Sequence, residues 1–401
     1  MPAHSTRTFG RRLTRLASVA LLGVLLAPSN VASAHEHDFL LVDEMLRSRV
    51  VRVAEVNAAA LVIIDRVGQE TVIPRRACLA LVRDDRSRFA RPARSTTTGM
   101  LMFADGQRIP GVPAPGAAIN EDAMLWQHPW LDQIAVPFDA ISAAVFEREA
   151  TLPESATGDV VQLRNGDRLE GFLTQFGTTL GLELEGSPPR EIEIPLDRVR
   201  AIRLVTEPRE RMGTRAWFRD GSVIDTPLLT LADDGYVHLD RPAGAVGRHT
   251  VRIEEITALR FDGGDLLPLS TLTPRDVSGP PERYFVPEPA IATHDAPLNA
   301  RAIEFRGPVT VSYRLPNAVN RFAASVELPD DSRNWGDLEL VIRDGGVERV
   351  RVPLNADSPR ADINIELTSR SFEVELLAGK FGPIQDRVIM RRALFMVETS
   401  E

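Results

Sequence analysis

The stretch Asp159-Val-Val-Gln-Leu-Arg-Asn-Gly-Asp-Arg-Leu-Glu-Gly-Phe-Leu173, with its continuation Glu191-Ile-Glu-Ile-Pro-Leu-Asp-Arg-Val-Arg-Ala-Ile-Arg-Leu-Val205, decides the fold of most of this chain. Apolar residues flank the Asn-Gly pair at 165–166, which indicates a β-hairpin because glycine adopts a positive φ without steric cost. Ile192, Ile194 and Leu196 then alternate with glutamate or proline, as in a half-buried strand. The stretch therefore predicts a small unit of antiparallel strands.

Three other parts of the chain repeat this unit. Copies of the turn occur as Phe103-Ala-Asp-Gly-Gln-Arg-Ile109 and Phe218-Arg-Asp-Gly-Ser-Val-Ile224, and the three turn glycines lie 60 and 55 residues apart. A weaker first copy ends at Ile73-Pro-Arg-Arg-Ala-Cys-Leu-Ala-Leu81 and lacks the glycine turn. Such repetition indicates an array of similar units rather than one large core.

We assign the four β repeats to residues 35–85, 96–149, 158–206 and 212–262. Four or five short strands around one apolar seam predict a small SH3-like or Sm-like barrel for each repeat. Because a unit of about 55 residues buries too little surface to be stable alone, we expect neighbouring units to pack in pairs.

Residues 1–34 have the pattern of a secretory signal peptide. Arginines at 7, 11, 12 and 15 precede the apolar run 16–27, and Ala32-Ser-Ala34 is a small-residue cleavage site. The apolar run is too short to span a bilayer, and no later run approaches the roughly 20 residues that a transmembrane helix needs. We therefore expect an exported protein, periplasmic or extracellular, with no transmembrane anchor, and the sequence leaves the Sec and Tat routes open.

The chain is acidic, with a formal net charge of −9 that becomes −13 when the four signal arginines leave. Nucleic acids and anionic membranes bind clustered positive charge, so we expect no nucleic-acid partner, although Sm-like barrels elsewhere bind RNA. Cys78 is the only cysteine, which excludes an intramolecular disulfide. Since it aligns with Ile141, Val199 and Ile256 of the other repeats, we interpret it as a buried, inert thiol.

Residues 263–300 are rich in proline and glycine, and we assign them as a lead-in to a different C-terminal region. From 301 to 398, strand-like segments follow one another at a spacing of about ten residues, without helical periodicity. Val309–Leu315 and Phe372–Leu376 alternate apolar and polar residues, and Asp344-Gly-Gly346 marks a hairpin turn. The pattern predicts a jelly-roll sandwich over 301–398, and with the repeats an all-β protein.

Residues from about 264 to 398 resemble an NPCBM-type carbohydrate-binding module, a family with a galactose-binding-like jelly-roll fold. The resemblance rests on Leu266–Pro274, Val311–Pro316, Arg321–Asp331, Gly336–Gly345 and Asp386–Leu394. It implies a non-catalytic, sugar-binding module of secreted proteins. The chain departs from the family pattern in two places, because Arg306–Thr310 contains no histidine and Arg387 replaces the histidine of a late Asp-His pair, after which the family's tryptophan is also missing.

A sugar site needs an aromatic face for the C–H side of the ring and polar groups for its hydroxyls. Six residues of the C-terminal region have this chemistry: Tyr313, Arg321, Asp330, Asp331, Trp335 and Asp386. The alternatives are that Tyr313 packs in the core, and that Asp330 and Asp331 are solvated or hold a structural Ca²⁺ through their oxygens. Trp335 follows a polar loop and is the least easily explained as a core residue.

Two smaller features have a functional and a structural interpretation each. Cleavage after Ala34 leaves His35-Glu-His37 at the N-terminus, and a free amine with histidine in the third position suits Cu(II) or Ni(II); the alternative is a terminus without function. Trp126, His128 and Trp130 form either an exposed patch for a partner or a contact between adjacent units.

The sequence contains no Gly-x-Ser-x-Gly elbow, His-Glu-x-x-His helix or P-loop. We therefore expect a non-catalytic protein without a cofactor, in which the array is a spacer or interaction surface and the sandwich recognises a glycan or a cell-surface protein. The first alternative is a structural or protein–protein adaptor whose sandwich no longer binds sugar. A second alternative is the accessory part of a larger glycan-processing assembly.

Overall fold

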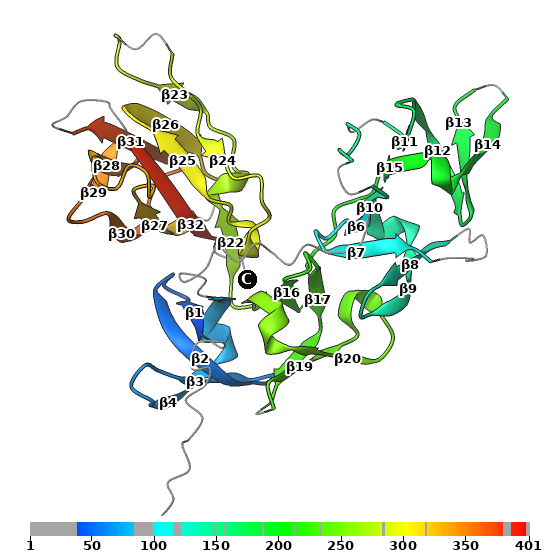
Figure 1. The fold of residues 1–401 in the computed structure, drawn as a ribbon, viewed down its shortest axis with the longest axis horizontal. Coiled ribbons are helices and arrows are strands. Elements are labelled where there is room, and N and C mark those ends of the chain that lie inside the picture. The colour runs from blue at the N-terminus through cyan, green and yellow to red at the C-terminus, as the bar shows by residue number, and fades with distance from the viewer. Residues whose placement is uncertain are drawn as a thin grey trace, which may run out of the picture. The chain divides into compact units, whose positions relative to one another are not determined.

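The computed structural model describes residues 38–83, 99–114, 122–147, 150–154, 157–186, 188–211, 213–232, 234–282, 285–316, 319–379 and 386–397. Within these ranges the chain forms antiparallel strands and short 3₁₀ turns, and none of the described residues lies in an α-helix. The prediction of an all-β protein is therefore confirmed (Figure 1). The predicted signal peptide, residues 1–34, lies outside the described residues.

The first β unit is a meander whose last strand returns to its first. Its elements are β1 (Asp38–Asp43), β2 (Ser48–Val56), β3 (Ala60–Ile64), β4 (Glu70–Pro74), the 3₁₀ turn η1 (Arg75–Ala77) and β5 (Cys78–Arg83). Strands β1 to β4 pair in sequence, and β5 pairs with β1. We call β5 and its counterparts below the closing strands.

The second and third units repeat this order. The second contains β6 (Gly99–Phe103), β7 (Arg108–Pro113), β8 (Ala123–His128), β9 (Asp132–Pro137), η3 (Phe138–Ala140) and the closing strand β10 (Ile141–Val145). The third contains β11 (Asp159–Leu163), β12 (Arg168–Phe176), β13 (Thr179–Leu184), β14 (Arg190–Pro195), η4 (Leu196–Arg198) and the closing strand β15 (Val199–Arg203). In each unit the closing strand pairs with the first strand.

In the fourth unit the second strand is divided by Pro227. Its elements are β16 (Thr214–Phe218), β17 (Val223–Thr226), β18 (Leu228–Leu231), β19 (Tyr236–Asp240), η5 (Pro242–Gly244), β20 (Arg248–Arg252), η6 (Ile253–Glu255) and the closing strand β21 (Ile256–Arg260). Because proline has no N–H to donate, Pro227 interrupts the hydrogen bonding of this strand and divides it into β17 and β18.

The closing strands begin at equivalent residues, and this explains the alignment of Cys78 with aliphatic residues. Cys78, Ile141, Val199 and Ile256 each follow a single 3₁₀ turn and open the closing strand of their unit. All four are fully buried. In the first three units the residue before the turn is a proline with φ near −55°. Because proline has no N–H, it suits the last position of the fourth strand, where no backbone donor is needed.

The units are joined through their closing strands. Strand β10 pairs with β15, which joins the second and third units, and β5 pairs with β21, which joins the first and fourth. The closing strands thus join the units in two pairs, of which only one consists of neighbours in the sequence, and a pairing of β7 with β17 joins the second and fourth units. Each closing strand has hydrogen-bonding partners on both of its edges.

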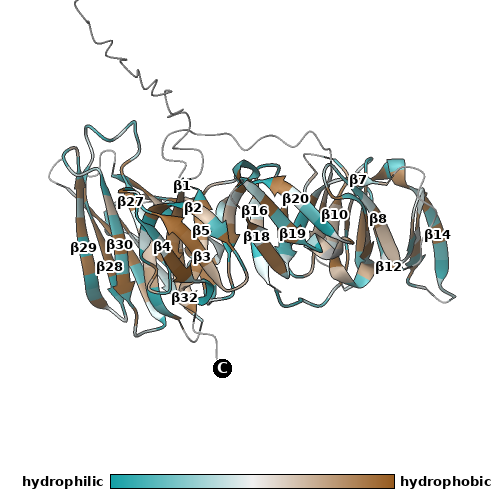
Figure 2. Cartoon of the chain, turned by 90° about the horizontal axis from the view of Figure 1, so that it is seen from below, coloured by the Kyte–Doolittle hydropathy of each residue, from teal (hydrophilic) through white to brown (hydrophobic). Residues whose placement is uncertain are grey.

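Strands β1 and β5 are buried on both faces. Phe39, Leu41 and Leu81 belong to the core of the β units, whereas Leu40 and Val82 belong to a second apolar cluster. This second cluster joins the first and fourth units to the C-terminal sandwich and includes Leu266, Leu298 and Leu394. A strand that is covered on both faces has a continuous apolar sequence, as in Phe39-Leu-Leu-Val42 (Figure 2).

The C-terminal region is a sandwich of two antiparallel sheets. One contains β24 (Ala290–Ile291), β25 (Ile303–Arg306), β32 (Arg387–Val397), β27 (Val319–Glu327) and β30 (Arg360–Glu366), with β22 (Asp265–Pro268) also on β32. The other contains β23 (Asp276–Ser278), β26 (Val309–Arg314), β31 (Ser371–Ala378), β28 (Asp337–Asp344) and β29 (Val347–Asn355). Phe322, Phe372 and Phe395 pack in the core between the sheets, with ring centroids 4.7 to 5.0 Å apart.

The predicted lead-in, residues 263–300, is part of this sandwich. Strands β22, β23 and β24 fall within it and pair with β32, β26 and β25, respectively. The predicted start of the sandwich at residue 301 is therefore too late. These strands have only two to four residues between prolines and turns, which is too short for a periodic pattern to be recognised.

The hairpin turn of the third unit gives a prediction about stability. Gly166 has φ +96°, and a Cβ built on it would meet no atom within 4 Å. Gly166→Ala should therefore lower the free energy of unfolding by about 1 kcal/mol through backbone strain alone. Gly166→Asn should cost less, since asparagine tolerates positive φ better than other L-residues. Denaturant titration of both variants tests this, and an alanine variant as stable as wild type would contradict the turn assignment.

Candidate functional site

Three connections of the sandwich lie at the same end. Strands β25, β27 and β31 finish there, and β26, β28 and β32 begin there, because Arg306 pairs with Arg387 and Leu338 with Ala378. The connections are residues 307–308, 328–336 and 379–386, of which 380–385 lie outside the described residues. We call the described residues of these connections the loop end.

Trp335 lies in the longest described connection of the loop end and is exposed. The residue is 71% exposed, whereas Leu328, at the start of the connection, is buried in the core. The backbone N–H groups of Trp335 and Gly336 both donate to the carbonyl of Ser332, over 3.0 and 2.7 Å. A Cβ at Gly336 would lie 3.0 Å from Leu328 Cδ1, so this connection is closely packed beneath the exposed indole.

The two predicted aspartates of the loop end are in ion pairs. Asp330 Oδ1 accepts from Arg333 Nη2 at 2.7 Å, and Asp331 Oδ2 accepts from Arg387 Nη1 at 2.8 Å. Both carboxylates are largely exposed, so these pairs orient the loop more than they stabilise the protein. Trp335 therefore shares its connection with charged side chains that are held in ion pairs.

Arg387 also anchors this end of the sandwich to β25. Its Nε donates to Glu304 Oε1 at 2.9 Å, and Arg306 Nε donates to the same oxygen at 2.8 Å. Partial burial raises the pKa of Glu304, but hydrogen bonds from the two guanidinium groups outweigh this effect and hold the pKa below its ordinary value. Glu304 thus stays ionised and holds the start of β32 in place.

Asp386 lies at the base of the loop end and is 3% exposed. Its carbonyl accepts a hydrogen bond of 2.7 Å from Gly307 N–H, which connects the 307–308 and 379–386 connections. Of the six predicted ligand residues, Asp330, Asp331, Trp335 and Asp386 lie in connections of this one end.

Tyr313 and Arg321 lie elsewhere, and the structure does not bring them to the loop end. Tyr313 is 2% exposed and packs against Phe372 with a ring-centroid distance of 6.4 Å, and burial raises the pKa of its hydroxyl. Arg321 Nη1 donates to Asn364 Oδ1 at 3.0 Å, and its Nη2 to Glu366 Oε1 at 2.5 Å, on the neighbouring strand β30. Both residues lie on strands, away from the connections, and already have partners within the sandwich.

Both predicted metal sites stay predictions. His35 and His37 lie outside the described residues, so the copper or nickel site stays a prediction. Within the described ranges there is no group of three or more histidine, cysteine, aspartate or glutamate side chains suited to a metal ion. Asp330 and Asp331 have arginine partners, and the structural Ca²⁺ ion also stays a prediction.

Phe285 is a second exposed aromatic residue that sequence reasoning missed. It is 73% exposed and lies in the connection from β23 to β24. This connection is at the loop end, because Ser278 pairs with Thr310 near the start of β26. The available signal was the aromatic pair Tyr284-Phe285 in the proline-rich stretch 279–289.

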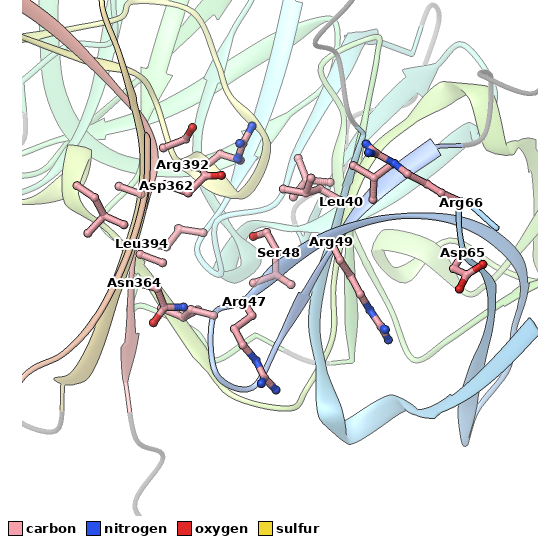
Figure 3. Close-up of a pocket in the computed structure, with 18 of the residues that line it drawn as sticks. Leu40, Arg47, Ser48, Arg49, Asp65, Arg66, Asp362, Asn364, Arg392 and Leu394 are labelled. Atoms are coloured by element: carbon pink, nitrogen blue, oxygen red, sulfur yellow. The ribbon is translucent and has the colours of Figure 1, made fainter. Parts of the chain in front are cut away.

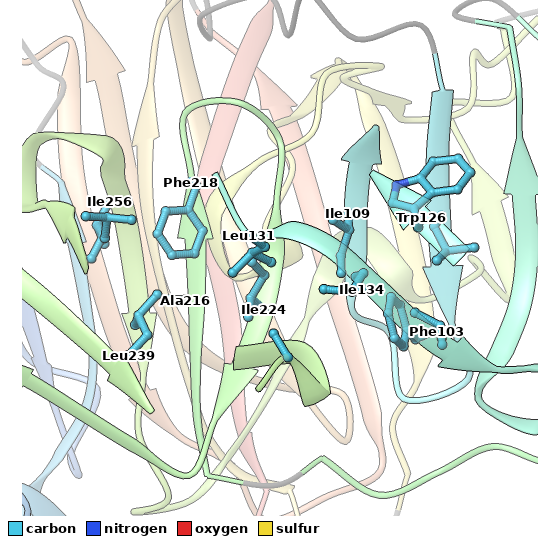
Figure 4. Close-up of a cluster of buried hydrophobic side chains, with 14 of the residues drawn as sticks. Phe103, Ile109, Trp126, Leu131, Ile134, Ala216, Phe218, Ile224, Leu239 and Ile256 are labelled. Carbon is cyan, nitrogen blue, oxygen red and sulfur yellow. The ribbon is translucent and has the colours of Figure 1, made fainter. Parts of the chain in front are cut away.

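Trp126, His128 and Trp130 form a contact between units, and the alternative of an exposed patch is wrong. Trp126 and His128 are fully buried. Trp130 packs on Phe218 of the fourth unit at 5.1 Å, and its Nε1 donates to Asp220 Oδ2 at 3.0 Å. Figure 4 shows Leu131 close to the apolar side chains of the fourth unit, and the cores of the two units are continuous.

His128 also forms a Ser–His–Asp group that is structural. Its Nε2 lies 3.2 Å from Ser222 Oγ and 3.7 Å from Asp220 Oδ2. Its Nδ1 accepts the backbone N–H groups of Trp130 and Leu131 at 3.3 and 3.2 Å, which assigns the ring proton to Nε2. A histidine protonated at Nε2 cannot take a proton from Ser222, so this arrangement lacks the general base that a nucleophilic serine needs.

Cys78 is likewise a structural residue. It is fully buried, and burial raises the pKa of its thiol to about 12. The interpretation of an inert thiol is therefore supported by its position, because the thiolate is the reactive form.

No protein-family model matches the chain, and no curated protein matches it. Its distant structural neighbours include a CBM51 module from Clostridium perfringens GH95 in complex with methyl-galactose, at 10% identity and TM-score 0.27, covering 33% of this chain and 99% of that one. Tandem CBM51 modules of a family 98 glycoside hydrolase from Streptococcus pneumoniae match at 10% identity and TM-score 0.28, covering 90% and 88%.

A third neighbour contains a CBM51 module in complex with GlcNAc, together with INT domains, from Clostridium perfringens ZmpB. It matches at 10% identity and TM-score 0.28, covers 42% of this chain, and is itself covered over 37% of its length. The chain thus has distant structural similarity to carbohydrate-binding modules. Within the described ranges, no helix has the length and apolar character needed to cross a membrane.

The buried histidine predicts a pH dependence of stability. Burial lowers the pKa of His128 to about 4 from an ordinary 6.5. The unfolded chain therefore takes up a proton before the folded one, and the stability contributed by neutral His128 is lost as pH falls from 6.5 to about 4. At about 1.4 kcal/mol per unit, the loss is about 3 kcal/mol.

Denaturant titrations between pH 7 and pH 4.5 measure this effect. His128→Asn should reduce the pH dependence, because the amide oxygen can still accept the two backbone N–H groups and the side chain does not titrate. Trp335→Ala, which removes no titratable group, is the control and should leave the pH dependence unchanged. An unchanged pH dependence in His128→Asn would contradict the assignment.

Proposed function

We propose that this chain is an exported, non-catalytic protein whose C-terminal sandwich binds a saccharide at the loop end. The sandwich would have the galactose-binding-like jelly-roll fold of the NPCBM-type modules that its sequence resembles. The four β units would be SH3-like barrels that present it. The topology that the units share supports the assignment of barrels. In each unit a four-stranded meander and a 3₁₀ turn precede a closing strand, which pairs with the first strand of the unit.

The observation that carries the proposal is the exposure of Trp335 on a closely packed loop. Trp335 is 71% exposed, so its indole is accessible to a ligand, and an aromatic ring with a polar N–H is suited to binding at a surface that is partly apolar and partly hydrated. An indole face suits the C–H side of a sugar ring, and the charged side chains of Asp330, Asp331 and Arg333 in the same connection suit its hydroxyls. The hydrogen bonds of the 328–336 connection already fix the backbone, so a ligand loses little entropy by ordering it.

The runner-up function, a protein–protein adaptor, has its own supporting observation in the third unit. Phe172 and Val205 are exposed over 68% and 61% of their area. Asp159 holds their backbones together, because its carboxylate accepts the N–H groups of Leu173 and Val205 at 2.9 and 2.8 Å. Such an exposed apolar pair is suited to a protein partner.

A glycan array probed with the full exported chain separates the two functions. The proposal predicts specific binding that Trp335→Ala weakens by at least tenfold, while stability stays within about 0.5 kcal/mol because the side chain is exposed. Phe172→Ala is the matched control, since it removes an equally exposed aromatic residue from the array and should leave glycan binding unchanged.

Two outcomes would count against saccharide binding at the loop end. One is the absence of binding across diverse neutral and acidic glycans together with a protein partner that Phe172→Ala releases, which favours the adaptor. The other is glycan binding that Trp335→Ala does not affect. Turnover of a glycan or ester substrate by the purified chain would overturn the non-catalytic assignment.

A further inference from the structure

A cavity of about 720 Å³ lies between the first β unit and the sandwich. One wall comes from β1, β2 and the turn between β3 and β4, and the other from β27, β30 and β32 (Figure 3). Asn364 joins the walls, because its Nδ2 donates to the carbonyl of Met45 at 2.9 Å and its Oδ1 accepts from Arg321. The cavity is thus a built feature, distant in sequence from the loop end.

The lining of this cavity is basic, although the chain as a whole carries a net charge of −9. Its charged residues are four arginines, at 47, 49, 66 and 392, and two aspartates, at 65 and 362. Arg47 is balanced by Asp43, which accepts from its Nε at 2.9 Å. Within the described part of the chain, Arg49 and Arg66 take part in no ion pair. Two guanidinium groups of the cavity lining are therefore available to a ligand.

The sandwich contributes Arg392 through a β-bulge. The register between β27 and β32 shifts between Ala323 and Ser325, and Arg392 at this point has φ +47°. A positive φ is costly for a non-glycine residue, and bulges commonly redirect a side chain next to a functional site. The bulge places Arg392 in the lining of the cavity, facing the wall formed by the first unit (Figure 3).

The remaining lining residues decide the class of ligand. Ser48, Ser325 and Asp362 offer hydrogen-bonding groups, Leu40 and Leu394 form an apolar surface, and the lining contains no aromatic side chain. A neutral sugar would therefore find hydroxyl partners without a stacking face. A sugar that carries a carboxylate gains from guanidinium groups, which bind carboxylates through paired hydrogen bonds.

We propose that this cavity binds an anionic saccharide, with the guanidinium groups of Arg49 and Arg66 attracting its negative charge and the serines and Asp362 contacting its hydroxyls. The volume lies within the range of small-molecule sites, roughly 300 to 1,000 Å³, and accommodates one or two sugar rings. The inference rests on the proposed function only for the choice of a saccharide, because the residues involved are separate from the loop end.

The test is calorimetric titration of the full exported chain with digalacturonate at low ionic strength. We expect binding that is weakened at least tenfold by the double substitution Arg49→Gln and Arg66→Gln, and that weakens with added salt. Arg52→Gln is the matched control, since Arg52 is exposed on the same strand and does not line the cavity. The control and Trp335→Ala should both bind digalacturonate as wild type does.

Three results would overturn the inference. They are no binding of digalacturonate to wild type, equal binding to wild type and the double arginine variant, or displacement by sodium acetate at the same concentration, which would show a site for any anion. Failure of the loop-end proposal is separate, because it concerns the glycans whose binding depends on Trp335. Retained folding of the arginine variants is checked by thermal unfolding, and Gln at exposed positions should change stability little.

Discussion

The structure depends on closing strands that are hydrogen-bonded along both edges. A five-stranded unit of this size has a small core and would leave its last strand as an open edge. Here β5 lies between β1 and β21, and β10 lies between β6 and β15. The edge that would otherwise be exposed becomes the junction between units, and the cores of the units merge into one apolar cluster.

The same constraint places the sandwich. One face of β1 and β5 packs against the core of their own unit. The other face packs against the sandwich, where Leu40 of β1 and Val82 of β5 belong to the same apolar cluster as Leu394 of β32. The sheet containing β27, β30 and β32 is used for this contact, and the cavity lies at its margin. The loop end carries Trp335 on connections that this contact does not use.

Several of these features could be predicted from the sequence because they are local. The Asn-Gly and Asp-Gly turns identify the hairpins, and Cys78 aligns with the opening residues of the other closing strands. The exposure of Trp335 follows from its position after a polar loop. In contrast, the union of the first and fourth units could not be predicted, since all four closing strands have similar apolar sequences.

Other features depend on segments that meet only in three dimensions. Alternation within Val309–Leu315 does not say which residues point into the core, and Tyr313 does so. The short strands of 263–300 are specified by their partners rather than by their own pattern. Arg49 and Arg392 are 343 positions apart, and the bulge that brings Arg392 to the cavity has no signature in the sequence.

Hydrogen exchange followed by mass spectrometry tests most directly the claim that the closing strands hold the array together. Backbone amides at 80–82 and 258–260, and those at 143–145 and 201–203, should be the slowest to exchange among the four units, with similar rates within each pair. Strands β4 and β14, each paired on one edge only, should exchange much faster. Closing-strand amides that exchange as fast as β4 and β14, or at unrelated rates within a pair, would contradict the account.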